Sequence, residues 1–159
     1  MKATRPQPSE KPSLTTPILV KGNRRVVITG SELVALPAET RRLTISCASG
    51  TRHTATWAGV PVLDLLETAG VSVETTHVVV ESEDDYRICV DMYAALDGIL
   101  AYMCDGTPLP EVRPYETRFV APDIDGARTV KAVRSVEPVQ LAPETDPESL
   151  EDLPVKSSS

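Results

Sequence analysis

Cys47 is the side chain whose type and place in the sequence could carry chemistry most directly. It ends the segment 42–47, in which apolar and polar residues alternate, and a loop of small residues, 48–50, follows it. This alternation has the period of a half-buried strand, so Cys47 is predicted at a strand end, where a firmly held side chain can still face a cleft. A thiolate there could act as a nucleophile or as a soft metal ligand. The alternative is a buried, inert cysteine, which is what most lone cysteines are.

The other reactive residue types form no known constellation. The sequence has no GxGxxG, P-loop or HExxH motif. His53 follows Cys47 closely enough for a Cys–His nucleophile pair to be conceivable, but no third residue is evident to orient the histidine. His77 opens an apolar strand and is interpreted as a packing or surface residue. The cysteines at 47, 89 and 104 are too widely spaced for a zinc site or a disulfide framework, and their spacing gives no support to a thiol-redox function.

Composition limits the remaining function classes. The 159 residues are 41% hydrophobic and 25% charged, which is typical of one globular domain. The net charge of −7 argues against binding nucleic acid or an anionic membrane, although a fold that gathers a few arginines could still bind an anion. Residues 1–17 lack the apolar stretch of a signal peptide, and no apolar run approaches the ~18 residues that span a bilayer. We therefore expect a cytoplasmic protein.

The elements that must position Cys47 belong to one predicted α+β domain, residues 16–140, between a disordered N-terminal tail (1–15) and an acidic disordered tail (141–159). A helix is predicted over 57–70, with Pro61 in its first turn and Gly70 as its C-terminal cap. Ser31 is predicted to cap a short helix over 29–37, and another short helix is expected at 92–96. Strands are predicted at 17–22, 25–29, 42–47, 77–82, 86–90, 99–104, 117–122 and 129–136.

Five short motifs stand in a distinctive order between residues 18 and 139. They are Cys47-Ala-Ser-Gly, Trp57-Ala-Gly-Val-Pro-Val-Leu-Asp-Leu-Leu, Ser82-Glu-Asp-Asp-Tyr, Ile99-Leu-Ala-Tyr with Asp105-Gly-Thr-Pro-Leu-Pro, and Arg118-Phe-Val-Ala-Pro with Gly126-Ala-Arg-Thr-Val-Lys. In this order they resemble the core of the sulfite-oxidase-type molybdopterin-binding domain. The resemblance implies the fold of the sulfite oxidase middle domain.

The same resemblance implies a cofactor and a set of site residues. Cys47 matches the thiolate that ligates molybdenum, and Arg118, Arg128 and Lys131 match positions near the phosphate of molybdopterin. Tyr86 could border the pocket. The implied activity is oxygen-atom transfer on a small oxyanion or sulfoxide, with an electron-transfer partner. For the three cations, exposed surface charge is the alternative interpretation.

The sequence also departs from the family pattern. Asp85 stands where glycine is usual, in a turn that favours a positive φ, and Ala132 stands where the family commonly has tryptophan. The Asn- and His-containing segment that closes over the pterin in longer members has no counterpart in residues 1–17, so we expect a half-open cofactor cleft. These departures motivate a second hypothesis, a non-catalytic relative that serves as a binding module without the metal.

Overall fold

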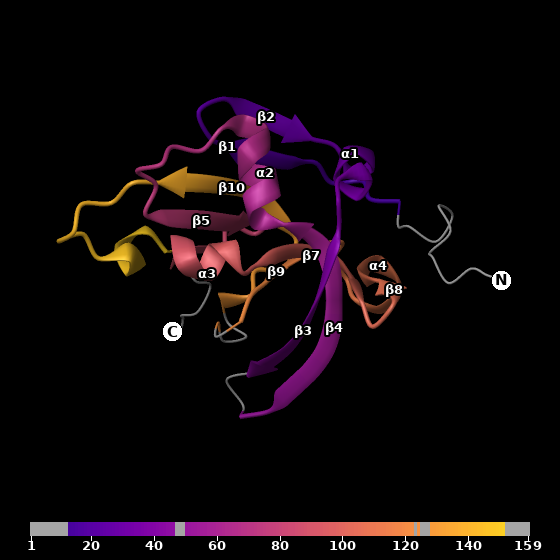
Figure 1. Cartoon of the computed structure of the whole chain (residues 1–159). Coiled ribbons are helices and arrows are strands. Elements are labelled where there is room, and N and C mark those ends of the chain that lie inside the picture. The colour runs from indigo at the N-terminus through magenta and orange to yellow at the C-terminus, as the bar shows by residue number, and fades with distance from the viewer. Residues whose placement is uncertain (1–12, 47–49, 123, 125–127, 152–159) are drawn as a thin grey trace.

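The computed structural model describes residues 13–46, 50–122, 124 and 128–151. These residues form two β-sheets with short helices between and beside them (Figure 1). The strands are β1 (Ile18–Lys21), β2 (Arg25–Ile28), β3 (Glu39–Ser46), β4 (Arg52–Pro61), β5 (His77–Ser82), β6 (Arg87–Asp91), β7 (Ile99–Cys104), β8 (Thr107–Pro108), β9 (Arg118–Val120) and β10 (Val133–Val139). The helices are α1 (Gly30–Ala35), α2 (Val62–Ala69), α3 (Met92–Leu96), α4 (Leu109–Val112) and the 3-10 helix η3 (Pro147–Leu150). The predicted α+β class is confirmed.

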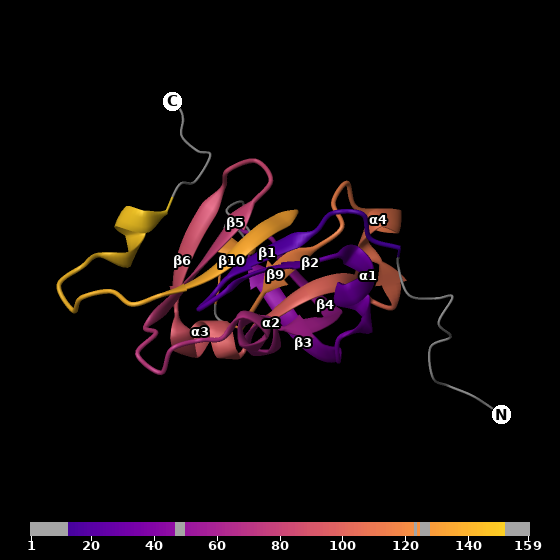
Figure 2. The ribbon, with the colours of Figure 1, turned by 90° about the horizontal axis from the view of Figure 1, so that it is seen from above.

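The first sheet has the strand order β2-β1-β10-β5-β6. Its pairs are antiparallel except for β1 and β10, which run parallel. Viewed from above, β10 lies between β1 and β5, so the last strand of the described chain pairs with the first (Figure 2). Helix α2 packs on this sheet through its buried face, Val62, Leu65, Leu66 and Ala69.

The second sheet has the order β3-β4-β7-β8, with β9 paired to β7. Strands β3 and β4 form a long hairpin that reaches away from the rest of the molecule (Figure 1). A hydrogen bond of 2.6 Å between the Thr44 and Thr54 hydroxyls crosses this hairpin. A separate hydrophobic cluster around Trp57 and Leu109 joins the base of the hairpin to β7 and β9.

The predicted helix over 57–70 begins later than expected. Trp57 to Pro61 belong to β4 and pair with β7, and α2 starts only at Val62. The close approach of the two strands explains the glycine of this motif, because a Cβ on Gly59 would lie 2.0 Å from the Leu100 carbonyl oxygen. Pro61 is the N-cap residue rather than a first-turn residue. The pairing energy of the strand therefore overrides the local helical signal.

Two further local predictions are corrected. Thr29, not Ser31, caps α1: its hydroxyl accepts the Glu32 N–H at 3.1 Å while the Glu32 carboxylate accepts the Thr29 N–H at 2.9 Å, a reciprocal capping box. His53 lies in β4, opposite Ile45, in a strand that was not predicted over residues 52–56. None of the helices in the described parts of the chain is long and apolar enough to cross a membrane.

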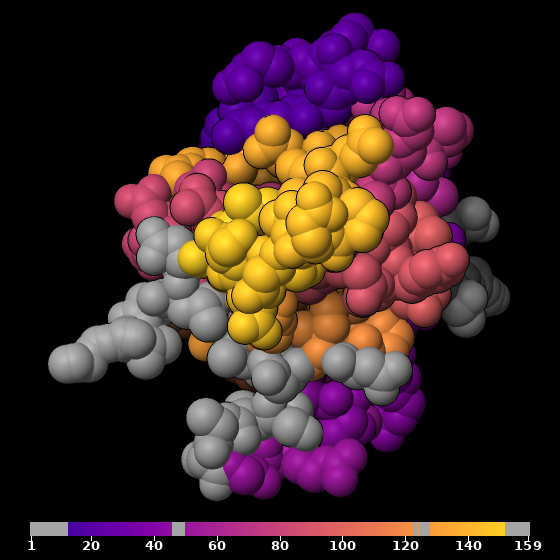
Figure 3. Space-filling model, turned by 90° about the vertical axis from the view of Figure 1, so that its left-hand side faces the viewer, coloured from indigo at the N-terminus to yellow at the C-terminus, as the bar shows by residue number. Residues whose placement is uncertain are grey.

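The C-terminal residues up to 151 pack on the domain, beyond the predicted boundary at 140. Their 3-10 helix η3 contacts β6, and the segment lies across that side of the molecule in Figure 3. The Arg87 Nε donates to the Leu150 carbonyl at 2.9 Å, which secures the segment to the outer edge of the sheet. The predictions for residues 1–12 and 152–159 lie outside the described residues.

Candidate functional site

A cationic pocket of about 390 Å³ is the candidate site. It opens between the loop that follows α4, strand β9 and the residues before β10. The residues that line it are Asp84, Arg113, Pro114, Tyr115, Arg118, Lys131 and Ala132. Three of these side chains carry a positive charge and one, Asp84 at the rim, carries a negative charge. This donor set fits a phosphate or another oxyanion.

Arg118 lies half-buried in this pocket, and its guanidinium is held on several sides. Its Nε donates to the Thr129 hydroxyl at 3.1 Å and lies 3.3 Å from the Thr129 carbonyl, while Nη2 donates to the same hydroxyl at 2.6 Å. Nη1 reaches the Tyr115 hydroxyl at 3.4 Å. The guanidinium carbon also lies 5.5 Å from the centroid of the Trp57 ring. Three of the five N–H groups are thus engaged, and one on each terminal nitrogen has no partner among the described residues.

Lys131 is brought to the same pocket by the backbone. Arg118 and Lys131 face each other across an isolated antiparallel bridge, and the Phe119 N–H donates to the Val130 carbonyl at 2.8 Å. The Lys131 ammonium lies 5.8 Å from the Tyr115 ring centroid. The next residue, Ala132, has a φ of 54°, which is uncommon for a residue with a Cβ. Its N–H donates to the Thr117 carbonyl and its own carbonyl accepts the Glu83 N–H, so two hydrogen bonds maintain this conformation.

Arg128 lies elsewhere, against β6 and the C-terminal segment. It forms an ion pair with Glu151, whose side chain is only 6% exposed, and its Nη2 also donates to the Cys89 carbonyl at 3.1 Å. A second cavity, of about 310 Å³, adjoins this contact and is lined by residues of β6, α3 and the C-terminal segment. The three cations matched by sequence therefore divide: Arg118 and Lys131 share the cationic pocket, and Arg128 does not line it.

Tyr86 and Asp85 belong to the turn between β5 and β6. Tyr86 packs against the main hydrophobic core, and the residue of this turn that lines the cationic pocket is Asp84. Ser82 shapes the turn, because its hydroxyl accepts the N–H groups of Asp84 at 3.0 Å and Tyr86 at 3.1 Å. Asp85 has a φ of 66°, so it adopts the positive φ expected where the family has glycine, and its carboxylate accepts a hydrogen bond from Arg134 at 2.7 Å.

Cys47 lies outside the described residues, so its position facing a cleft stays a prediction. The strands that flank it, β3 and β4, are paired up to Ser46 and Arg52. Cys89 and Cys104 are both buried and free. Burial, with a contribution from Glu151 against that of Arg128, raises the pKa of the Cys89 thiol to about 11. The pKa of Cys104 is raised as well, mainly by burial. In the parts of the chain that the structure describes, no three His, Cys, Asp or Glu side chains gather to hold a metal ion.

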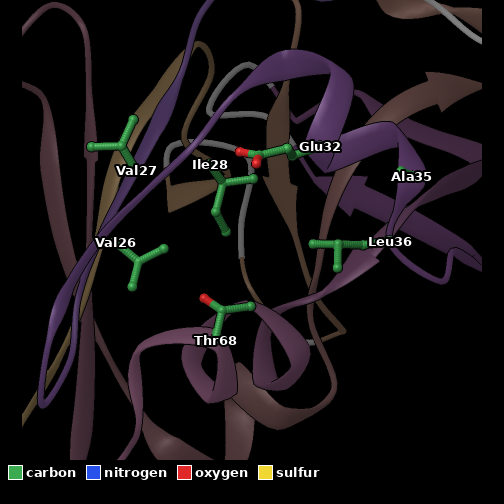
Figure 4. A pocket seen from close by; sticks show the side chains of 7 residues that line it. All are labelled: Val26, Val27, Ile28, Glu32, Ala35, Leu36 and Thr68. Carbon is green, nitrogen blue, oxygen red and sulfur yellow. The ribbon is translucent and has the colours of Figure 1, made fainter.

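An apolar cavity of about 380 Å³ lies on another part of the surface, between β2, the end of α1 and α2 (Figure 4). Val26, Val27 and Ile28 form one wall, and Glu32 is its one charged residue. The Glu32 carboxylate is engaged in the capping box of α1. This cavity offers no cation to an anionic ligand, so it is not the candidate site.

Sequence reasoning missed the residues that surround Arg118. Thr129 and Tyr115 show no periodic or motif signal of their own, and Trp57 was assigned to a helix. A signal did exist for Trp57, since a single tryptophan in a chain poor in aromatic residues is a strong packing candidate. The role of Thr129 depends on the crossing of β9 with the segment before β10, which no local pattern predicts.

Comparison with known proteins agrees with the motifs. The family described as "oxidoreductase molybdopterin binding domain" matches residues 8–145. Mitochondrial sulfite oxidase of Drosophila melanogaster is 33% identical over 132 residues, which cover 76% of this chain and 22% of that protein. The uncharacterized oxidoreductase YuiH of Bacillus subtilis is 26% identical over 115 residues, covering 70% of this chain and 58% of that protein.

A solved structure shares the fold. The sulfane dehydrogenase SoxCD from Paracoccus pantotrophus superposes with a TM-score of 0.73 at 24% sequence identity, covering 82% of this chain and 39% of that chain. The present chain thus spans about a fifth of the fly sulfite oxidase and less than half of the SoxCD chain. The family match, the motif order and the fold agree, and the chain belongs to the oxidoreductase molybdopterin-binding domain family of the sulfite oxidase type.

Proposed function

We propose that this domain binds molybdenum–molybdopterin and forms the oxygen-atom-transfer module of an oxidoreductase. The observation that supports this most directly is the cationic pocket, in which Arg118 is fixed by its neighbours and Lys131 stands beside it. In the proposal, these two side chains hold the phosphate of the pterin, and Cys47 ligates the metal. When bound, the cofactor supplies two-electron oxygen-atom chemistry that no side chain of the protein can perform.

The protein's own part is binding and orientation. Arg118 presents two N–H groups in a fixed fork, which suits two oxygens of one phosphate, while the Lys131 ammonium adds a point charge. Asp84 also lines the pocket, and its carboxylate can only accept hydrogen bonds when ionised. It would therefore bind the hydrogen-bond donors of a ligand and repel a second anion. A soft thiolate at Cys47 would donate charge to the metal.

The substrate class follows from the family by analogy. Two of the three similar proteins named above are a sulfite oxidase and a sulfane dehydrogenase. We propose a small sulfur oxyanion or sulfoxide as substrate, with a separate electron-transfer partner. The cytoplasmic location and the role of Arg128 in cofactor binding stay predictions.

The test is to produce the protein in a host that makes the cofactor, and to measure molybdenum and pterin per chain separately. We expect one of each in the wild type, and Cys47→Ser should lose the metal. Cys89→Ser is the matched control, because Cys89 is buried in β6 and bound to no ligand in this proposal. Wild-type protein that carries neither metal nor pterin would refute the proposal and favour the non-catalytic binding module.

A further inference from the structure

Arg118 is the residue of the cationic pocket whose orientation the structure explains in most detail. Thr129 and Trp57 both contact its guanidinium, and neither side chain lines the pocket itself. We infer that Thr129 and Trp57 are positioning residues that hold Arg118 in the orientation needed to bind an oxyanion. The inference rests on the proposed function, since it takes this pocket to be the phosphate site.

Thr129 fixes one edge of the guanidinium. Its side chain is 1% exposed, and its hydroxyl oxygen accepts N–H groups from both Nε and Nη2 of Arg118. Two donors on one oxygen determine the position and the plane of the fork. The threonine itself is constrained by its β-branch and by burial. Arg118 therefore loses little further rotamer freedom when it binds an anion, which is how preorganisation increases affinity.

Trp57 fixes the face of the same group. Its ring is fully buried and lies under the guanidinium carbon at 5.5 Å, a distance suited to a cation–π contact. The indole N–H of Trp57 has no acceptor among the described residues. Buried tryptophans usually find such a partner, so the ring is placed here for its face rather than for its hydrogen bond. The cluster around Trp57 joins β4 to β7 and β9, so the ring that contacts Arg118 is itself packed in the core of the second sheet.

The experiment uses inorganic phosphate as the probe and Trp57 as the reporter. Trp57 is the single tryptophan of the chain, so the fluorescence of the full-length protein reports on the ring beneath Arg118. We expect saturable quenching or enhancement on titration at low ionic strength, with calorimetry giving the same Kd. Thr129→Val, which keeps the shape and removes the acceptor, should weaken phosphate binding about tenfold, whereas Thr129→Ser should restore it to within about twofold.

Thr117→Val is the matched control for a purely structural effect. Thr117 is also buried, at 3% exposure, and its hydroxyl accepts the Val133 N–H at 3.0 Å without touching Arg118. Its loss should lower the urea midpoint and leave the Kd for phosphate unchanged. If Thr129→Val binds phosphate like the wild type, Thr129 does not position Arg118, and the proposed function is unaffected. If the wild type binds no phosphate, the inference is overturned together with the anion site, while the pterin content measured above decides the proposed function separately.

Discussion

Glu151 joins the C-terminal segment to the domain through an ion pair and a hydrogen bond to β6, and its substitution tests whether that segment is an integral part of the fold. One carboxylate oxygen accepts the Cys89 N–H at 2.9 Å, on the outer edge of β6. Both oxygens accept hydrogen bonds from the Arg128 guanidinium. Glu151 and Arg128 together satisfy the N–H and the carbonyl of Cys89, as a neighbouring strand would. This caps the unpaired edge of the first sheet.

The cost of removing the carboxylate can be worked from burial. Breaking a fully buried ion pair by deleting one partner costs about 3–5 kcal/mol. Here the Glu151 side chain is 6% exposed but that of Arg128 is 26% exposed, so water recovers part of the loss. We expect Glu151→Ala to lower the free energy of unfolding by about 2 kcal/mol, and Glu151→Gln, which keeps an acceptor, by about 1 kcal/mol.

Two measurements separate local from global effects. Urea unfolding gives the change in stability, and amide exchange by NMR reports whether the Cys89 N–H becomes accessible. The control is Glu148→Gln, because Glu148 lies in the same segment with its side chain exposed. Protection of the Cys89 amide should fall in the Glu151 variants and stay unchanged in the control. Wild-type exchange and stability in Glu151→Ala would refute the reasoning and show that the segment is held by other contacts.

Three further predictions concern a carboxylate, a backbone conformation and two buried thiols. The pKa of Glu116 is lowered, because hydrogen bonds from Thr15 and Thr16 outweigh the opposing effect of burial. The ionised carboxylate therefore stabilises the folded state at neutral pH, and this contribution is lost as the pH falls below about 4.5. Glu116→Gln should make the free energy of unfolding less dependent on pH in that range. Ala132→Gly should raise stability by about 1 kcal/mol in urea unfolding, since it relieves a positive φ; an unchanged midpoint would argue against strain there. Cys89 and Cys104 should react slowly with a thiol reagent at pH 8 in folded protein and rapidly in urea, because burial raises both pKa values.

Local sequence signals predicted which helices and strands exist better than they predicted the residues at which these elements begin and end. The spacing of Val62, Leu65, Leu66 and Ala69 indicated the buried face of α2 correctly. The predicted start of the helix was wrong, because residues 57–61 pair with β7, about forty positions further along the chain. A pairing partner at that distance leaves no mark on the local pattern. The C-terminal segment shows a similar dependence on distant partners: the Glu151 side chain accepts the Cys89 N–H of β6, a contact that composition alone does not indicate.

The candidate site shows the same division between motif and geometry. By sequence, Arg118, Arg128 and Lys131 are three equivalent cations in one motif. The backbone bridge brings Arg118 and Lys131 together, while Arg128 forms an ion pair with Glu151 on another part of the domain. Spacing could not have separated them, because the difference depends on a partner 23 residues away. The prediction about the turn succeeded because it was local: a positive φ at Asp85 follows from the turn alone.

The acidic composition and the cationic pocket are compatible because the charges are unevenly distributed over the domain. Glu116 adjoins the pocket loop, but its carboxylate accepts hydrogen bonds from the backbone and hydroxyl of Thr15. Asp85 adjoins the rim, yet its charge is paired with Arg134. Of the acidic residues in the described parts of the chain, only Asp84 lines the pocket, against three cations. Three cations and one acidic residue line the pocket, so it is locally cationic despite the net charge of −7 of the chain. A composition that argues against nucleic-acid binding is therefore compatible with a small anionic ligand in this pocket.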